Sequence, residues 1–236
     1  MSERQNRVLE SIMACLLIIG MILVARESAQ LVQTLNHAEV ADSSGKPVVV
    51  LDAGHGGIDP GKVGINGELE KDINLAIAHK VKRYLEQQNV KVIMTRQEDI
   101  GLYQESDSNK KVVDMKARLA MIEEASPQLA VSIHQNSYPD ASVSGMQVFY
   151  YKDSLKGKNA ALLMQQQMIA SMQPKKEREA KDNGTYYLLK KTTVPLIIVE
   201  CGFLSNETEA ALLSTDAYQE KLAWSIHLGI LRYLSF

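Results

Sequence analysis

Three short runs along the chain are almost entirely apolar, with no regular polar alternation. They lie at residues 48–51, 129–133 and 196–199. Such runs are typical of strands that are covered on both faces, as in a parallel sheet flanked by helices. Further strands are predicted at residues 90–95 and 146–151, and a strand or edge segment at residues 186–189.

A different spacing predicts the helices. Apolar residues recur at every fourth position at Ile73, Ile77, Val81 and Leu85, which indicates a helix over about residues 70–88. Other helices are predicted at residues 112–124, 157–172, 208–213 and 216–234. The last of these would bury a face made of Leu222, Trp224, Ile226, Ile230 and Leu231, with His227 simply on the helix face.

The alternation of strands with helices predicts an α/β fold. We expect a twisted, mixed and mostly parallel sheet of about six strands, with helices on both faces. The chain has 236 residues, of which 45% are hydrophobic, and this suits one globular domain with a short extension.

The first residues form that extension. An uncharged apolar run of 14 residues, 12–25, follows Arg4 and Arg7. Because a spanning helix needs about 20 apolar residues, this run favours a signal peptide within residues 1–25, but no clear cleavage site follows it, so a retained membrane anchor is equally supported. We expect an exported protein, secreted or anchored at the cell envelope. Residues 26–46 are predicted to be a linker, and residues 47–236 the folded domain.

Charge and cysteine content argue against a nucleic-acid-binding protein and against a cysteine-rich zinc site. The net charge of −2 lacks the basic excess expected of a nucleic-acid-binding protein, so no nucleic acid partner is expected. The chain has only two cysteines, which excludes a cysteine-rich structural zinc site. Cys201 is interpreted as a packed, inert thiol, because burial beside a carboxylate would raise its pKa.

Polar side chains with chemical potential follow the three apolar runs. His55, set among glycines, comes after the first run, His134 ends the second and Glu200 ends the third. The carboxyl ends of parallel strands meet at one edge of a sheet, where such folds bind ligands. Glu70 is a fourth candidate at the start of a predicted helix, where favourable interaction with the helix dipole is the simpler interpretation.

Two histidines and one carboxylate are a typical ligand set for catalytic zinc, since they leave one coordination position open for water. The second carboxylate would then be the base that takes a proton from water activated by the metal. The residue types alone do not decide which of Glu70 and Glu200 has which role.

Four motifs bear on that choice. They stand at 52–57, 70–75, 132–136 and 200–206, and they resemble the signatures Asp-x-Gly-His-Gly-Gly, Glu-Lys-Asp-x-Asn-Leu, Ser-Ile-His-x-Asn and Glu-x-Gly-Phe-Leu-Ser-Asn. These signatures belong to the zinc-dependent N-acetylmuramoyl-L-alanine amidases of the type 3 family, and the resemblance extends from about Pro47 to the C-terminus.

The resemblance implies that His55, Glu70 and His134 are zinc ligands and that Glu200 is the catalytic carboxylate. It also implies hydrolysis of the peptidoglycan amide that joins the lactyl group of N-acetylmuramic acid to L-alanine of the stem peptide. Asn136 and Arg118 are candidates for substrate binding, although Arg118 would equally suit a residue that holds acidic groups or faces water. The chain departs from the family at Ile122-Glu123, where members often carry Ala-Asn.

The overall plan most resembles the germination-specific amidases of the spore cortex. It implies a role in cortex maturation in the forespore intermembrane space, with an N-terminal membrane contact. Because no wall-binding repeats occur, an activating or tethering protein is also expected. The alternatives are a vegetative cell-wall amidase, another zinc hydrolase such as a peptidase or deacetylase, and a non-catalytic peptidoglycan-binding module. The presence of Glu200 argues against the last.

Overall fold

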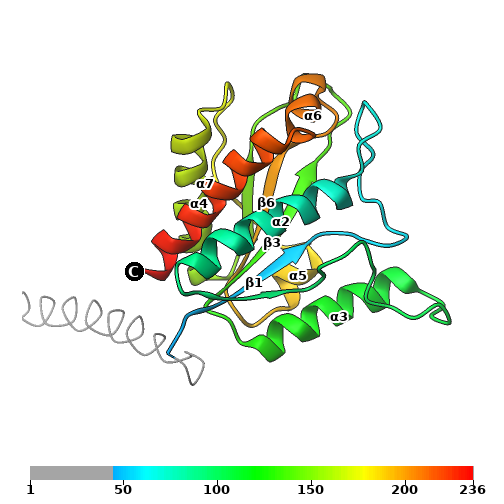
Figure 1. Cartoon of the computed structure of the whole chain (residues 1–236), viewed down its shortest axis with the longest axis vertical. Coiled ribbons are helices and arrows are strands. Elements are labelled where there is room, and N and C mark those ends of the chain that lie inside the picture. Colours follow the sequence, from blue (N-terminus) through cyan, green and yellow to red (C-terminus); the bar gives the residue numbers. More distant parts are fainter. Residues whose placement is uncertain (1–44, 236) are drawn as a thin grey trace, which may run out of the picture. The chain divides into compact units, whose positions relative to one another are not determined.

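A six-stranded sheet forms the centre of residues 45–235, the part of the chain that the computed structural model describes (Figure 1). The elements are β1 (Val48–Ala53), α2 (Glu70–Gln87), β2 (Lys91–Met94), α3 (Lys110–Ala125), β3 (Leu129–Asn136), β4 (Gln147–Tyr151), α4 (Leu155–Met172), β5 (Lys181–Asn183), α5 (Tyr187–Lys191), β6 (Leu196–Phe203), α6 (Glu207–Leu213) and α7 (Asp216–Leu234). The predicted signal peptide or anchor at 1–25, and nearly all of the predicted linker at 26–46, lie outside the described residues.

The strand order is β2-β1-β3-β6-β4-β5. Strands β2, β1, β3 and β6 pair in parallel, β4 pairs antiparallel with β6, and β5 runs parallel to β4. The sheet is therefore mixed and mostly parallel, which confirms the fold class predicted from the apolar runs.

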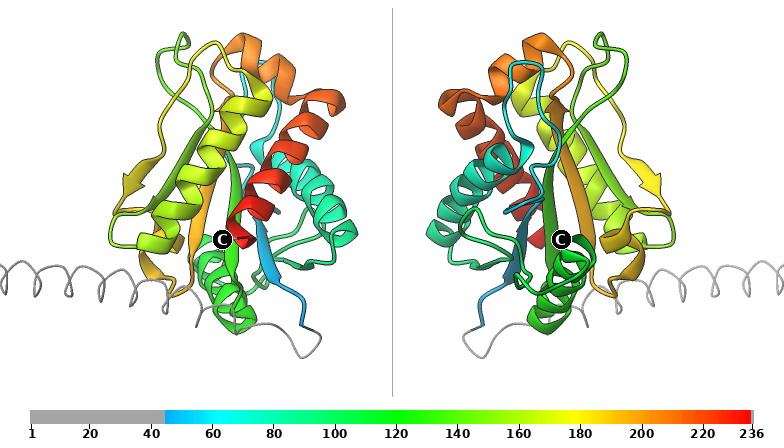
Figure 2. Two further views of the ribbon diagram at one scale, coloured as in Figure 1. Left: turned by 90° about the vertical axis from the view of Figure 1, so that its left-hand side faces the viewer. Right: turned by 90° about the vertical axis from the view of Figure 1, so that its right-hand side faces the viewer.

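Helices cover both faces of the sheet, but unequally (Figure 2). The larger core includes buried residues of α2, α4 and α7, and the smaller core includes residues of α3 and α5. Among the helices of residues 45–235, none has the length and apolar character needed to cross a membrane.

The alternation of side chains along the central strands decides what lies on each face. Leu51, Val131 and Val199 belong to the larger core, whereas their neighbours Val50, Ala130 and Ile198 belong to the smaller one. Continued along each strand, the second series leads to polar residues at the carboxyl ends. These are Asp52, Ser132, His134 and Glu200. The smaller-core face therefore carries the polar groups.

The predicted strand at residues 186–189 is wrong, because this segment begins the short helix α5. The Asn183 side chain accepts hydrogen bonds from the backbone N–H groups of Thr185 and Tyr186 and so starts a turn there. Leu188 and Leu189 both belong to the smaller core, whereas a strand would direct consecutive side chains to opposite faces of the sheet. The preceding edge strand β5 was not predicted, because its sequence Lys-Asp-Asn is polar and mostly exposed.

Helix α7 has the predicted bounds, but two side chains lie differently from the prediction. Trp224 is 46% exposed, although it was predicted to lie on the buried face. His227 is buried, and its ring centroid lies 5.4 Å from that of Tyr84 in α2. The buried face of α7 is therefore rotated from Trp224 toward His227, because both α2 and α4 pack against this helix.

Candidate active site

His55 lies in the loop after β1 in a left-handed backbone conformation, with φ of 63°. A non-glycine residue in this region is uncommon and is often found at functional sites. Its Nδ1 atom lies 3.0 Å from Asp59 Oδ2, and its Nε2 atom lies 3.2 Å from Glu70 Oε2. Asp59 thus orients the imidazole so that Nε2 faces Glu70, the arrangement in which an outer carboxylate fixes a metal-binding histidine.

His134 lies near the end of β3 and packs directly against Gly54. A Cβ atom at Gly54 would overlap the His134 ring, so this position needs a glycine for the close approach rather than for an unusual φ. The Nδ1 atom of His134 lies 2.9 Å from Glu70 Oε1. Gly54 therefore makes room for the ring that meets Glu70.

Glu70 begins α2 and is only 2% exposed. Its carboxylate accepts hydrogen bonds from the backbone N–H groups of Lys62 (2.8 Å) and Gln135 (3.1 Å), and it faces both imidazoles. Burial alone would raise the pKa of Glu70, but the hydrogen bonds from His134 and His55 outweigh it and lower the pKa. The structure thus directs Glu70 into the site, whereas the helix start itself lacks a side-chain cap.

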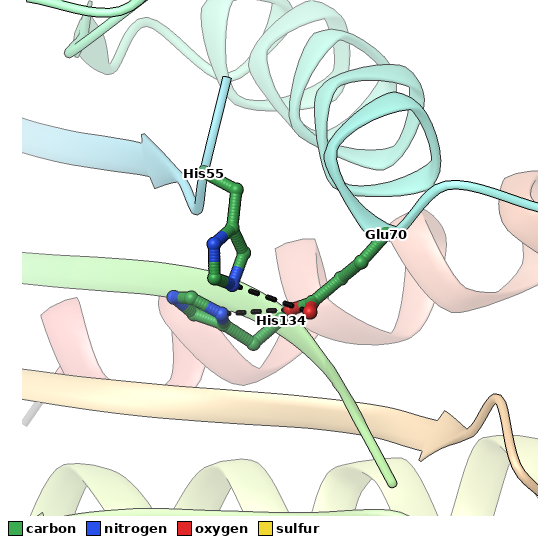
Figure 3. A group of neighbouring side chains, drawn as sticks. All are labelled: His55, Glu70 and His134. Atoms are coloured by element: carbon green, nitrogen blue, oxygen red, sulfur yellow. Dashed lines mark hydrogen bonds and ion pairs between the residues drawn. The ribbon is translucent and has the colours of Figure 1, made fainter. Parts of the chain in front are cut away.

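One nitrogen of each imidazole and one Glu70 oxygen all lie within 4.8 Å of one another (Figure 3). Two imidazoles and a carboxylate are donors that suit zinc, and an ion between them would replace the present hydrogen bonds. Burial would lower the pKa of His134, but Glu70 raises it to about 9. Because an imidazole binds a metal ion only in its neutral form, an ion at this site would compete with the proton that Glu70 favours on His134.

Glu200 lies on β6, beside this cluster, and is 7% exposed. Its Oε2 atom has no hydrogen-bond partner among the described residues. Burial raises the pKa of Glu200 to about 7. A carboxyl group with this pKa and a free oxygen can both accept and return a proton near neutral pH, which is what general acid–base catalysis requires.

Arg118 forms the floor of the site together with Asp52. Its guanidinium is buried and donates to Asp52 Oδ1 (2.7 Å), to Asp114 Oδ2 (2.6 Å) and to the carbonyl oxygen of His55 (2.6 Å). Of the interpretations open from the sequence, the structure therefore shows the one in which Arg118 holds acidic groups. It also holds the strained backbone of His55 in place.

A cavity of about 580 Å³ opens above these residues. Its lining contains every predicted site residue, including Asn136 at the end of β3 and the edge of the Arg118 side chain. It also contains residues that the sequence analysis missed: Lys62, Lys111, Tyr186 and Tyr187. No motif marks these four; the only local signal is the pair of adjacent tyrosines before two apolar residues.

Residues 49–232 match the family model described as N-acetylmuramoyl-L-alanine amidase. The chain belongs to this family. The match spans the sheet, the three candidate ligands and Glu200, so it covers the part of the chain that forms the site.

Individual amidases resemble the chain over most of its length. The germination-specific N-acetylmuramoyl-L-alanine amidase of Bacillus subtilis is 40% identical over 195 residues, which is 81% of each chain. The CwlD amidase of Clostridioides difficile, solved in complex with the GerS lipoprotein, superposes with a TM-score of 0.78 at 39% identity and covers 80% of this chain and 99% of its own. The catalytic domain of CwlV from Bacillus (Paenibacillus) polymyxa gives a TM-score of 0.71 at 32% identity, covering 80% and 98%.

Proposed function

We propose that this amidase hydrolyses the bond between N-acetylmuramic acid and L-alanine of the peptidoglycan stem peptide, and that it acts in the spore cortex. The family match and the similarity to a germination-specific amidase support this activity and this role. The observation that carries the proposal is the position of the buried carboxyl group of Glu200 beside two histidines and Glu70 at one edge of the sheet. A vegetative role, a peptidase or deacetylase activity and a purely binding role are less well supported.

We further propose that His55, Glu70 and His134 hold a zinc ion. Support comes from the donor types, their mutual distances and the fixed orientation of the His55 ring. Bound zinc supplies Lewis acidity toward the amide carbonyl oxygen and makes water more acidic.

The residues of the chain would then carry out the proton transfers. Glu200 takes a proton from water as the water oxygen bonds to the amide carbonyl carbon, and it returns this proton to the alanine nitrogen as the carbon–nitrogen bond breaks. Its burial matters for both steps, since a pKa near neutrality lets the same group act first as base and then as acid. Asn136, at the cavity wall, is proposed to donate to a carbonyl oxygen of the substrate.

The cellular setting is proposed from the same similarities. An exported protein fits a peptidoglycan substrate, and residues 1–25 are proposed as the signal peptide or membrane anchor that precedes the linker 26–46. The CwlD amidase of C. difficile was solved with a lipoprotein bound. We therefore propose that this chain acts in the forespore intermembrane space. A lipoprotein in that compartment is proposed to activate or tether it.

Mass spectrometry of digested peptidoglycan would test the reaction. The purified domain of residues 47–236 should release stem peptides with a free N-terminal L-alanine, and added zinc should restore activity after chelation. A deacetylase would release acetate and a peptidase would cut within the stem peptide. Either product, without free N-terminal alanine, would contradict the proposed reaction.

A further inference from the structure

The cavity has two chemically different ends. Asp59 and Lys62 lie in the loop between β1 and α2. Lys111, near the start of α3, places its Nζ atom 3.3 Å from Asp59 Oδ2. This end, here called the cationic end, lies on the β1 side and carries both lysines; the Lys111 side chain pairs with Asp59 but is 71% exposed, so its ammonium group can still reach a ligand. At the other end, the Tyr186 ring lies 5.6 Å from the Phe149 ring of β4. That end is aromatic and lies on the β4 side.

The sheet order separates these two ends. Strands β3 and β6 lie between β1 and β4, and they carry His134 and Glu200 in paired positions. A substrate whose reacting bond lies at Glu200 must therefore extend toward the aromatic end in one direction and toward the cationic end in the other. The two lysines and the two tyrosines line the same cavity as Glu200, so one molecule can reach all of them.

The aromatic end is built as a fixed surface. At its start, Asn183 holds the backbone of Thr185 and Tyr186. Beyond the helix, the Glu123 carboxylate accepts hydrogen bonds from the Thr192 hydroxyl (2.6 Å) and the Thr193 backbone (2.7 Å). Because these bonds already fix both ends of the segment, a ligand that binds there does not have to order it, and little conformational entropy is lost on binding.

The interior of the same segment is held by packing. Leu188 and Leu189 are buried beneath it, whereas Tyr186 and Tyr187 stay 37% and 36% exposed. Phe149 supports the Tyr186 ring from the strand side. The tyrosine rings therefore stay accessible at the cavity wall and are held in place by the packing beneath them. A surface on which a ligand ring stacks needs both properties.

The glycan and the stem peptide of the proposed substrate differ in chemistry as the two ends of the cavity do. A glycan presents sugar rings with C–H faces that stack on aromatic side chains, whereas a stem peptide carries free carboxylates that pair with ammonium groups. We propose that Tyr186 and Tyr187 bind the glycan and that Lys62 and Lys111 bind a stem-peptide carboxylate, so that the substrate has one orientation across Glu200. This proposal rests on the amidase activity proposed above.

Kinetics on matched soluble muropeptides would test the aromatic end. Two substrates would share one peptide but carry one muramic acid or a tetrasaccharide. The parent enzyme should have a lower KM for the longer glycan. Tyr187→Ala should raise the KM for the tetrasaccharide roughly 3- to 10-fold, the value of one aromatic contact, with kcat little changed. Tyr187→Phe keeps the ring and should keep the preference.

A second substrate pair would test the cationic end. Here the glycan is constant and the α-carboxyl group of the second stem residue is either free or amidated. The parent should prefer the free carboxylate, and Lys111→Ala should reduce that preference roughly 2- to 5-fold, as expected for a solvent-exposed ion pair. Lys116→Ala is the matched control, since Lys116 is exposed on the same helix but does not line the cavity.

Controls separate this inference from the amidase proposal. Tyr138→Ala removes an exposed tyrosine outside the cavity and should change neither preference. Circular dichroism on each variant would confirm the fold. If the parent cleaves none of these muropeptides, the amidase proposal fails. If it cleaves them but Tyr187→Ala retains the glycan preference, or loses the carboxylate preference instead, the orientation proposed here is wrong.

Discussion

Glu200 and His134 occupy paired positions on the adjacent parallel strands β6 and β3. The pairing fixes the distance between the proposed base and a proposed zinc ligand through backbone hydrogen bonds, not through flexible loops. The strand register therefore sets the position of the Glu200 carboxyl group relative to the His134 ring.

Glu200→Gln should keep the fold and the metal but lose activity. The amide is similar in size but cannot exchange a proton, so muropeptide release should fall by roughly 10²- to 10⁴-fold. Zinc content and product release would be measured on the same sample. The neighbouring variant Cys201→Ala is the control: its thiol is buried in the larger core, where burial raises its pKa, so activity should be close to that of the parent. A Glu200→Gln enzyme with zinc and near-parental activity would disprove the role of Glu200.

Loss of a proposed ligand should lower metal content. His134→Ala removes one donor and Glu70→Gln replaces a carboxylate by a weaker amide donor, so both should bind zinc less tightly. Glu68→Gln is the control, since Glu68 lies two residues away and bonds Asn66 and Ser214 instead of the histidines. Metal analysis after dialysis against a weak chelator would measure the effect. Full zinc occupancy in His134→Ala would remove this residue from the ligand set.

Gly54→Ala should disturb the site through a single methyl group. The added Cβ would overlap the His134 ring and push it away from Glu70, so zinc affinity and activity should both fall. Gly184→Ala is the matched control, because a Cβ there would meet only the Lys152 side chain at 3.5 Å. Isothermal titration with zinc would compare the two variants. Equal affinity in both would show that the His134 ring has room to move.

Asp52 should make stability depend on pH in the acidic range. Burial alone would raise its pKa, but Arg118 and the hydrogen bonds from Ser132 and Thr95 lower it from 3.8 to about 2. The folded state therefore binds this proton more weakly than the unfolded chain. The stabilisation, on the order of 2 kcal/mol, is present above about pH 4 and is lost as the pH falls toward 2.

Denaturant unfolding at several pH values would check this. Asp52→Asn should be less stable at pH 7, because Arg118 loses a buried partner, and its stability should fall less between pH 5 and pH 2. Asp153→Asn changes an exposed aspartate and should leave the pH dependence as in the parent. If the free energy of unfolding of Asp52→Asn falls between pH 5 and pH 2 as much as that of the parent, the pKa assigned to Asp52 is wrong.

Removal of residues 1–25 should yield a soluble enzyme with unchanged chemistry. The apolar run precedes the proposed linker and shares no residue with the site. Membrane fractionation and the specific activity of the truncated protein would be compared with those of the full chain. Loss of activity with the fold intact would show that this segment acts in more than targeting.

The sequence by itself determined the central strands and the helices other than α5, and it marked His55, His134 and Glu200 at or just after strand ends. These features are local: an apolar run without alternation must be covered on both faces, and the polar residue that ends it must lie at the edge of the sheet. The four family motifs led to the proposed roles of Glu70 and Glu200, which residue types alone left open.

Only the tertiary structure decided which polar groups are removed from water and what they meet. From the sequence, Arg118 could equally hold acidic groups or face solvent. The packing of α3 against the sheet places its guanidinium beside Asp52. The segment that became α5 could not be identified as a helix, because its end contacts with Asn183 and Glu123 come from other elements. Lys111 and Tyr187, 76 residues apart, share one cavity through folding alone. Sequence patterns record how each segment is buried, whereas partners distant in the chain are chosen by packing.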